Sequence, residues 1–213
     1  MRVLVACECS GAVRDAFLAL GHDAISCDLL PSETPGPHVQ GDVAPMLGDP
    51  WDLVIAHPPC TFLSYAATKY WNRPGRAEKR EAALVFFVAC YNANAPRVCV
   101  ENPVGYPNTV FRKPDQVIQP FHYGDRQRKQ TCLWLRGLPP LWSRPTDELF
   151  GPRTHTDPPA PTYVDRKSGT RRYFTDAISG TGGAGERSKT FPGIAAAMAQ
   201  QWGAQVGDLC SGR

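Results

Sequence analysis

The sequence predicts an α/β fold with a parallel β-sheet, to which a small loop-rich insertion is added. Short apolar runs alternate with helix-like segments through the first two thirds of the chain, which is the pattern of βαβ units. From Pro139 to Lys189 the chain is rich in Pro, Gly and Arg, which is typical of loops. With 213 residues, 42% hydrophobic and 20% charged, it has the size and composition of an ordinary globular domain.

The first two thirds predict a Rossmann-like order of elements. The clearest buried strand is Asp52–Ala56, a run of apolar and β-branched residues. Helical spacing of Val13, Phe17 and Leu20 predicts the first helix. The other expected strands are Val3–Ala6, Ala24–Leu29, Val39–Val43 and Arg97–Glu101, and the expected helices are Gly11–Leu20 and Arg76–Cys90.

Beyond Pro107 the pattern changes. Gln116–Tyr123 and Thr131–Leu135 are close enough to form an antiparallel strand pair, and Tyr163–Asp165 and Tyr173–Phe174 are expected short strands. A helix over Pro192–Trp202 carries Ile194, Met198 and Trp202 along one face. We therefore expect a core over 1–140, a loop-rich region over 141–188 and a helix over 189–213 that returns to the core.

The charge is distributed unevenly. Residues 112–172 hold twelve Lys or Arg against six Asp or Glu, so this segment carries +6 and the rest of a chain of net charge +3 carries −3. A basic segment on an acidic body is typical of a surface that binds a nucleic-acid backbone, and equally of a solvated loop. The N-terminus has no secretory pattern and no apolar run is long enough to span a membrane, so we expect a cytoplasmic protein.

The eight cysteines do not form a metal or disulfide pattern. No Cys-x-x-Cys pair occurs and no histidine stands at ligand spacing from a cysteine, so we expect no metal site. Buried thiols in a reducing compartment explain most of them.

One cysteine has a context that indicates chemistry. Asp52–Ala56 is followed by His57, two prolines and Cys60, which places Cys60 at the carboxyl edge of the sheet. Ligands bind at that edge in open α/β sheets, and paired prolines hold the next side chain in a fixed direction. Cys60 is therefore the candidate nucleophile, against the alternative of a structural cysteine after a rigid turn.

A carboxylate follows the next strand. Glu101 ends Arg97–Glu101, so two adjacent strand ends would bring it close to a ring that Cys60 attacks. A thiolate adds to C6 of a pyrimidine when a protonated or hydrogen-bonding carboxyl activates N3, and C5 then becomes nucleophilic. The alternative for Glu101 alone is a carboxylate that caps a loop.

These stretches resemble the cytosine-5 DNA methyltransferase family, in particular its short members from phage and prophage genomes. Pro58-Pro59-Cys60 is similar to the nucleophile motif of the family, and Glu101-Asn102-Pro103-Val104 to its Glu-Asn-Val motif. The resemblance covers nearly the whole chain and implies a Rossmann-like methyltransferase sheet with a reduced target-recognition region over 141–188. It also implies methyl transfer from S-adenosylmethionine to C5 of a cytosine flipped out of duplex DNA, through a covalent bond from Cys60 to C6. We expect a monomer.

The resemblance implies roles for further residues. The turn Ala6–Gly11 would hold the methionine part of the cofactor, Asp28 its ribose and Asp42 its adenine amine. Arg187–Ile194 and the helix after it resemble the last motif of the family, beside the cofactor. The expected catalytic residues are Cys60, Glu101 and Arg128; the cofactor-binding residues Glu8, Ser10, Gly11, Asp28, Asp42 and Pro58; the substrate or nucleic-acid contacts His57, Asn102, Arg126, Lys129, Arg171 and Arg172. Arg166 and Lys167 are further candidate phosphate contacts, and Tyr173 and Phe174 could stack on bases or fill a small core.

The chain departs from the family pattern in three places. Cys7-Glu8-Cys9-Ser10-Gly11 replaces an aromatic-x-Gly-x-Gly turn, Gly124 stands where the arginine motif opens with Gln, and the recognition region has shrunk to about Leu141–Ser188. The alternatives are cytosine-5 methylation of RNA or of a free nucleotide, and an inactive nucleic-acid-binding module, which would need neither Cys60 nor Glu101. An N6-adenine methyltransferase is disfavoured, because His57 and Cys60 occupy the places of its amine-binding and aromatic residues.

Overall fold

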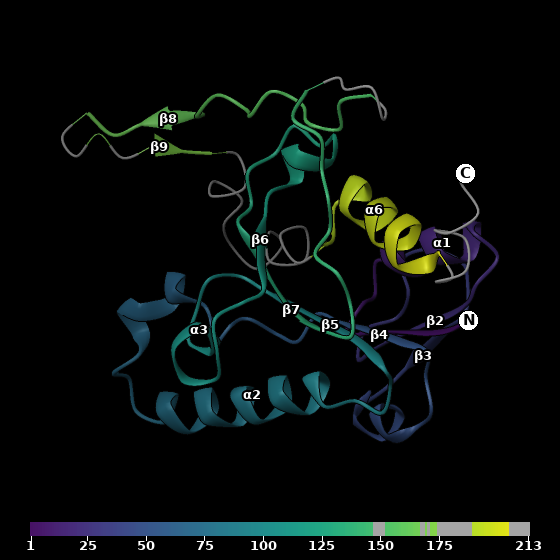
Figure 1. Cartoon of the computed structure of the whole chain (residues 1–213). Helices are drawn as coiled ribbons and strands as arrows, with labels where there is room; N and C mark the ends of the chain where they lie inside the picture. Colours follow the sequence, from purple (N-terminus) through teal and green to yellow (C-terminus); the bar gives the residue numbers. More distant parts are fainter. Residues whose placement is uncertain (147–151, 167–168, 170, 174–188, 205–213) are drawn as a thin grey trace.

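The computed structural model describes residues 1–146, 152–166, 169, 171–173 and 189–204. Its centre is a seven-stranded sheet in the order β3-β2-β1-β4-β5-β7-β6 (Figure 1). The strands run in parallel except β7, which is antiparallel to both its neighbours. The α/β Rossmann-like fold is thus confirmed. The strands are β1 (Arg2–Ala6), β2 (Asp23–Asp28), β3 (His38–Gln40), β4 (Leu53–Ala56), β5 (Arg97–Asn102), β6 (Gln116–Ile118) and β7 (Thr131–Arg136).

Helices cover both faces of the sheet, and accordingly β4 is apolar along its whole length, as are the middle residues of β1 and β5. On one face α1 (Ala12–Ala19) and α6 (Pro192–Gly203) bury Phe17, Met198 and Trp202 against β1 and β4. On the other face α2 (Arg76–Tyr91) buries Phe87 against Trp134 of β7 (Figure 1). These two apolar layers fix the sheet, so the ends of its strands are held in place.

The last described helix, α6, packs on the core. Pro192 stands in its first turn, where a missing N–H costs nothing. The Trp202 indole donates to the carbonyl of Pro139, and the Arg97 guanidinium at the start of β5 donates to the carbonyl of Trp202. Helix α6 is thereby tied to the amino edge of the sheet at its end and leaves its start near the carboxyl edge.

Three sequence predictions differ from the structure in extent. The strand expected over Val39–Val43 is β3 (His38–Gln40), and Val43 instead caps the turn that follows. The strand expected over 116–123 ends at Ile118, because Pro120 has no N–H for the ladder and opens the turn η3 (Pro120–Tyr123). The expected strand Tyr163–Asp165 is β8 (Tyr163–Val164), whose partner is β9 (Arg171–Arg172), not the segment Tyr173–Phe174. Phe174 lies outside the described residues, as do Lys167 and the Arg187-Ser188 start of the last motif.

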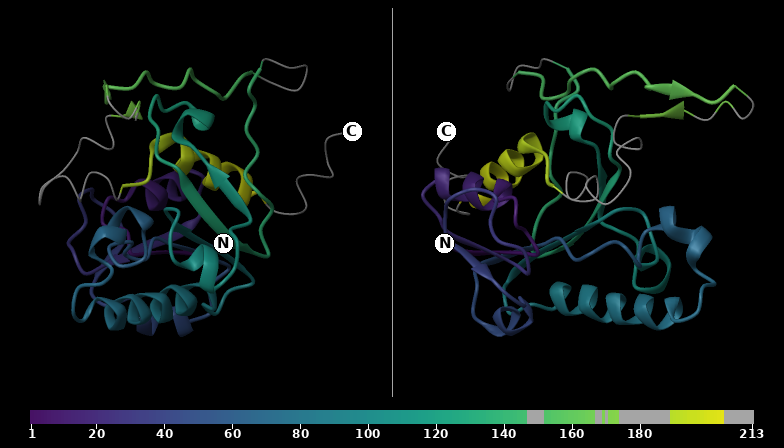
Figure 2. Two further views of the ribbon diagram at one scale, coloured as in Figure 1. Left: turned by 90° about the vertical axis from the view of Figure 1, so that its left-hand side faces the viewer. Right: turned by 180° about the vertical axis from the view of Figure 1, so that it is seen from behind.

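The connections complete the described chain. The β8–β9 hairpin extends away from the body of the molecule (Figure 2). Shorter turns are η1 (Ala44–Gly48), η2 (Tyr65–Tyr70) and α3 (Pro107–Val110). Among the helices of the described residues, none is both long and apolar enough to cross a bilayer.

Candidate active site at the carboxyl edge of the sheet

Cys60 stands in a rigid turn directly after β4. Pro58 is buried and Cys60 is exposed. The Cys60 carbonyl accepts hydrogen bonds from the N–H groups of Leu63 and Ser64, at 3.0 and 2.9 Å. The backbone on both sides of the thiol is therefore held, while the sulfur is accessible.

The other described thiols are poorly suited to nucleophilic chemistry. Of the seven cysteines that the structure describes, Cys60 alone is exposed. Burial raises the pKa of the Cys90 thiol to about 12 and that of Cys7 and Cys99 well above the ordinary value. Because the thiolate is the nucleophile, the raised pKa values disfavour these buried thiols, and accessibility singles out Cys60.

Glu101 lies beside the end of β4. The register pairs Ala56 with Val100, so His57 and Glu101 follow side by side, and His57 Nδ1 is 3.1 Å from Glu101 Oε2. Only 9% of Glu101 is exposed. Burial by itself raises the pKa of this carboxyl, but Lys129, His57 and Thr131 more than offset that effect, and the pKa lies below its ordinary value. Glu101 is therefore an ionised carboxylate near neutral pH.

Two adjacent cations have different surroundings. Lys129 and Thr131 line a small pocket with Glu101, and the Lys129 charge lowers the Glu101 pKa. The Arg128 guanidinium lies instead over the rings of Phe121 and Tyr173, at 5.3 and 5.0 Å. Of the two, the structure thus brings Lys129 to the carboxylate, whereas the sequence analysis named Arg128 as the catalytic cation.

The far wall of that pocket comes from the start of α6. It consists of Thr190, Phe191, Ile194 and Met198, and the Lys129 ammonium donates to the carbonyl of Lys189 at 3.4 Å. The last family motif predicted from the sequence therefore lies beside Glu101 in its described part.

Asn102 supports the nucleophile turn. Its Nδ2 donates to the Pro58 carbonyl at 2.7 Å, so β5 holds the Pro-Pro turn of β4 in place. Its Oδ1 is buried and has no hydrogen-bond partner among the described residues. The amide nitrogen of Asn102 thus binds the protein itself, and the expected contact of Asn102 with substrate stays a prediction.

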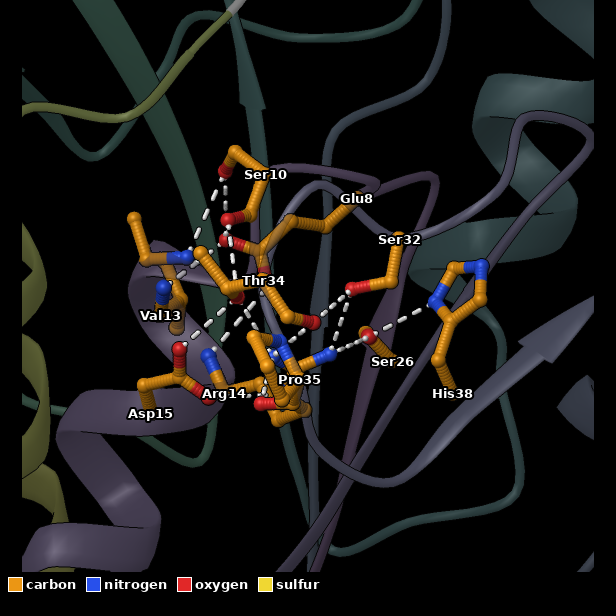
Figure 3. A network of polar contacts seen from close by, with 11 residues as sticks. Glu8, Ser10, Val13, Arg14, Asp15, Ser26, Ser32, Thr34, Pro35 and His38 are labelled. Atoms are coloured by element: carbon orange, nitrogen blue, oxygen red, sulfur yellow. Dashed lines mark hydrogen bonds and ion pairs between the residues drawn. The ribbon is translucent and has the colours of Figure 1, made fainter.

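The turn after β1 is built around two buried charges (Figure 3). The Glu8 carboxylate accepts from the N–H groups of Val13 and Arg14, at 2.7 and 3.2 Å, and from the Ser10 hydroxyl at 3.3 Å. It therefore caps the start of α1, which follows Gly11 in the left-handed conformation at φ 76°. A side chain at Gly11 would collide with Thr34 and Arg14.

Arg14 is a residue that the sequence analysis missed. Its guanidinium is fully buried and donates to Ser26 Oγ, Ser32 Oγ and Thr34 Oγ1 at 3.1, 3.0 and 2.7 Å (Figure 3). It also pairs with Asp15 at 2.8 Å. The sequence held one indication of it: Arg14 is a charged residue directly after Val13, among the residues that α1 buries. Arg14 holds the loop after β2 against α1 and so shapes the floor of the expected cofactor site.

Asp28 and Asp42 lie at the same edge of the sheet. Asp28 ends β2, and its Oδ1 accepts from the N–H of Leu30; the exposed Asp42 similarly accepts from Ala44 N–H, both at 2.9 Å. Leu29 and Leu30 beside Asp28 are 73% and 60% exposed, an apolar surface next to a carboxylate. No group of three or more His, Cys, Asp or Glu in the described part of the chain could hold a metal ion.

The remaining predicted residues lie apart from this edge or are described only in part. Arg126 is exposed in the segment before β7, and Arg171 is exposed on the β8–β9 hairpin. Arg172 belongs to β9. Their assignment to a nucleic-acid partner stays a prediction.

Fold and site together define an α/β Rossmann-like protein with an exposed cysteine and a buried, ionised glutamate at adjacent strand ends.

No protein-family model and no curated protein matches the chain. Several solved structures resemble it, among them the following two. One, from an E. coli prophage and assigned as a DNA modification methyltransferase, has 15% identity over 84% of this chain and 55% of that one, with a TM-score of 0.44. The other, a mutant of Spodoptera frugiperda DNMT2, has 14% identity over 84% and 59%, with a TM-score of 0.41. The chain thus spans less than two thirds of either, and at these values the likeness assigns it no activity.

Proposed function

We propose that this protein is an S-adenosylmethionine-dependent methyltransferase, and that it methylates C5 of cytosine in DNA through a covalent Cys60–C6 intermediate. The observation that carries the proposal is the pairing of an accessible thiol with a buried carboxylate at the ends of β4 and β5. That pair supplies the two groups that nucleophilic addition to a pyrimidine requires.

Cys60, Glu101 and Lys129 have different roles in the proposed reaction. The Cys60 thiolate adds to C6 of the ring, and the carboxyl of Glu101 faces N3 and stabilises the charge that builds up there. The ring is then nucleophilic at C5 and accepts a methyl group. Loss of the C5 proton and departure of the Cys60 sulfur restore the aromatic ring. Lys129, beside Glu101, supplies a positive charge for the same face of the ring.

Glu101 is ionised in the free protein and must take up a proton before it can bind N3. Its pKa is lowered, so the free enzyme holds a carboxylate, which repels the lone pair of N3. Entry of the base excludes water from the pocket and opposes ionisation, and Glu101 then takes up a proton that it shares with N3.

The carboxyl edge of β1 to β3 fits S-adenosylmethionine, which supplies an electrophilic methyl group when bound. Asp28 would hold the ribose hydroxyls, Leu29 offers apolar surface to the adenine, and Asp42 would meet its amine. In dinucleotide-binding sheets the first helix N-terminus binds a pyrophosphate. Here the Glu8 carboxylate already occupies those N–H groups, which favours a cofactor without phosphates.

DNA is the proposed substrate because exposed cations lie on segments outside the strand-end site, where they can contact backbone phosphates. Arg126, Arg166 and Arg171 are all exposed. Chemistry at C5 requires the base to leave the stack, so the substrate is a duplex with a flipped cytosine. The short region over 141–188 predicts recognition of only a few base pairs.

Trapping with 5-fluorocytosine tests the proposal. The fluorine at C5 cannot leave as a proton does, so the methylated adduct persists and is seen by denaturing gel and mass spectrometry. We expect an adduct with duplex DNA and S-adenosylmethionine that Cys60→Ser abolishes and that Cys90→Ala, a change in the core on α2, retains. An adduct with RNA or with a free nucleotide, but not with DNA, would replace DNA as the proposed substrate and leave the proposed mechanism standing. No adduct with any of the three would contradict the proposal.

A further inference from the structure

The second ring nitrogen of His57 has an unusual environment. The His57 side chain is 7% exposed, and its Nε2 is buried without a hydrogen-bond partner among the described residues. A buried polar atom that stays unpaired costs about 1–3 kcal/mol. An atom in that state, at the edge of the sheet where ligands bind, indicates that a ligand completes the hydrogen bond.

The first ring nitrogen fixes the tautomer. Glu101 is ionised and therefore only accepts hydrogen bonds, and its Oε2 lies 3.1 Å from His57 Nδ1. Nδ1 must accordingly carry the proton and donate it to Glu101. In the neutral imidazole Nε2 is then a bare acceptor, which can be satisfied only by a donor.

Asn102 independently indicates a ligand that carries hydrogen-bond donors. Because its Nδ2 donates to the Pro58 carbonyl, the orientation of the amide is fixed and Oδ1 is the atom left over. Oδ1 is also an acceptor. Two buried acceptors thus stand unpaired after the neighbouring strands β4 and β5, and both call for N–H or O–H groups on the ligand.

We propose that His57 is a specificity-determining residue, whose Nε2 accepts a hydrogen bond from the exocyclic 4-amino group of the target base. The inference rests on the proposed function and deepens it. Cytosine presents N–H groups at position 4, whereas uracil and thymine present an oxygen there. An oxygen opposite the lone pair of Nε2 leaves two acceptors facing each other, so His57 selects cytosine over uracil.

The surroundings of the pair support this state of His57. Lys129 and Thr131 approach Glu101 from the segment that leads into β7, and both favour its ionised form. The thiols of Cys99 and Cys132 also interact with Glu101, and burial raises the pKa of each, so both stay neutral. Oε2 of Glu101 therefore accepts from Nδ1, and the proton that Glu101 shares with N3 when the base enters lies on its other carboxyl oxygen.

Nitrogen-15 NMR of histidine-labelled protein without ligands gives the first test. We expect the Nδ1–H tautomer of His57, with a bare Nε2, and loss of that tautomer preference in Glu101→Ala. An Nε2–H tautomer in the wild-type protein would overturn the inference whatever the enzyme does.

The second test measures selectivity. The amide nitrogen of Asn can replace Nδ1 toward Glu101 but offers nothing in place of Nε2, so His57→Asn removes only the proposed contact. We compare adduct formation on duplexes with 5-fluorocytosine and with 5-fluorouracil. We expect the wild-type protein to form more adduct with 5-fluorocytosine than with 5-fluorouracil. His57→Asn should lower this ratio about tenfold, as loss of one hydrogen bond implies. His22→Asn, at the opposite edge of the sheet, should leave the ratio unchanged.

The outcomes separate the two proposals. A wild-type enzyme that traps 5-fluorocytosine, with the same selectivity in His57→Asn, overturns the role of His57 and keeps the proposed function. A wild-type enzyme that traps neither base overturns both.

Discussion

At the scale of single residues, Glu101 shows how neighbours decide the state of a buried carboxyl. Its burial disfavours the charge, whereas Lys129, His57 and Thr131 favour it and prevail. The sequence analysis placed Glu101 correctly at the strand end but expected a protonated or hydrogen-bonding carboxyl. Which neighbour carries the compensating charge depends on the direction of side chains in the segment before β7, and no sequence pattern distinguishes Arg128 from Lys129 there.

A pH dependence of stability follows from that lowered pKa. A carboxyl whose pKa is lower in the folded state than in the unfolded state stabilises the fold above the unfolded value, about 4.3 for Glu, and loses that contribution as the pH falls through the folded value. We expect the wild-type protein to lose stability relative to Glu101→Gln as the pH is lowered from about 6 to below 4. Urea unfolding of both proteins across this range measures the difference.

Lys129→Met serves as the partner variant in the same measurement. Without the ammonium group the pKa of Glu101 rises. We therefore compare the unfolding free energy of Lys129→Met with that of the double variant Lys129→Met and Glu101→Gln across the same pH range. The change of this difference with pH should be smaller than the change between the wild-type protein and Glu101→Gln. Equal differences in both backgrounds would show that Lys129 does not set the charge of Glu101.

At the scale of elements, the sequence predicted what depends on local periodicity. The strands β1, β4 and β5 and the helices α1, α2 and α6 are confirmed within one or two residues of their predicted ends, because apolar spacing and proline placement determine them. The clamp around Arg14 could not be predicted, since its partners lie twelve to twenty-one residues away, in β2 and in the loop after it. A buried guanidinium with so many acceptors organises the first two strand ends as one unit.

Removal of that guanidinium should therefore affect stability and cofactor binding together. Arg14→Met leaves the acceptors of Ser26, Ser32 and Thr34 without their donor, at an expected cost of about 3 kcal/mol. For a domain of this size that lowers Tm by about 6–12 °C, which differential scanning calorimetry measures. Arg14→Lys should recover only part of the loss, because one ammonium cannot replace a planar fork of donors. Full recovery by lysine would show that charge alone matters at this position.

At the scale of the whole molecule, a second group of cations lies beside Cys60. Residues 69–80 hold five Lys or Arg against one Glu, a feature that the sequence analysis passed over. Arg76 donates to the carbonyl of Thr61, next to Cys60, and lies over the ring of Phe62 at 4.5 Å, while Arg80 stacks on Trp71 at the same distance. The basic segment found from composition, 112–172, thus accounts for only part of the cationic surface around the site.

The hairpin arm allows the proposed DNA contact to be tested without disturbing the core. Arg166 and Arg171 are exposed on or beside β8–β9, which extends from the body (Figure 2). Each cation that contacts a phosphate releases counterions, so its loss lowers the slope of log K against log salt by about 0.9. The double variant Arg166→Gln and Arg171→Gln should therefore reduce the slope by about two, as measured by fluorescence anisotropy on a short duplex. Arg2→Gln, at the amino edge of the sheet, should leave the slope unchanged. An unchanged slope in the double variant would place the phosphate contacts elsewhere, with residues 69–80 as the next surface to substitute.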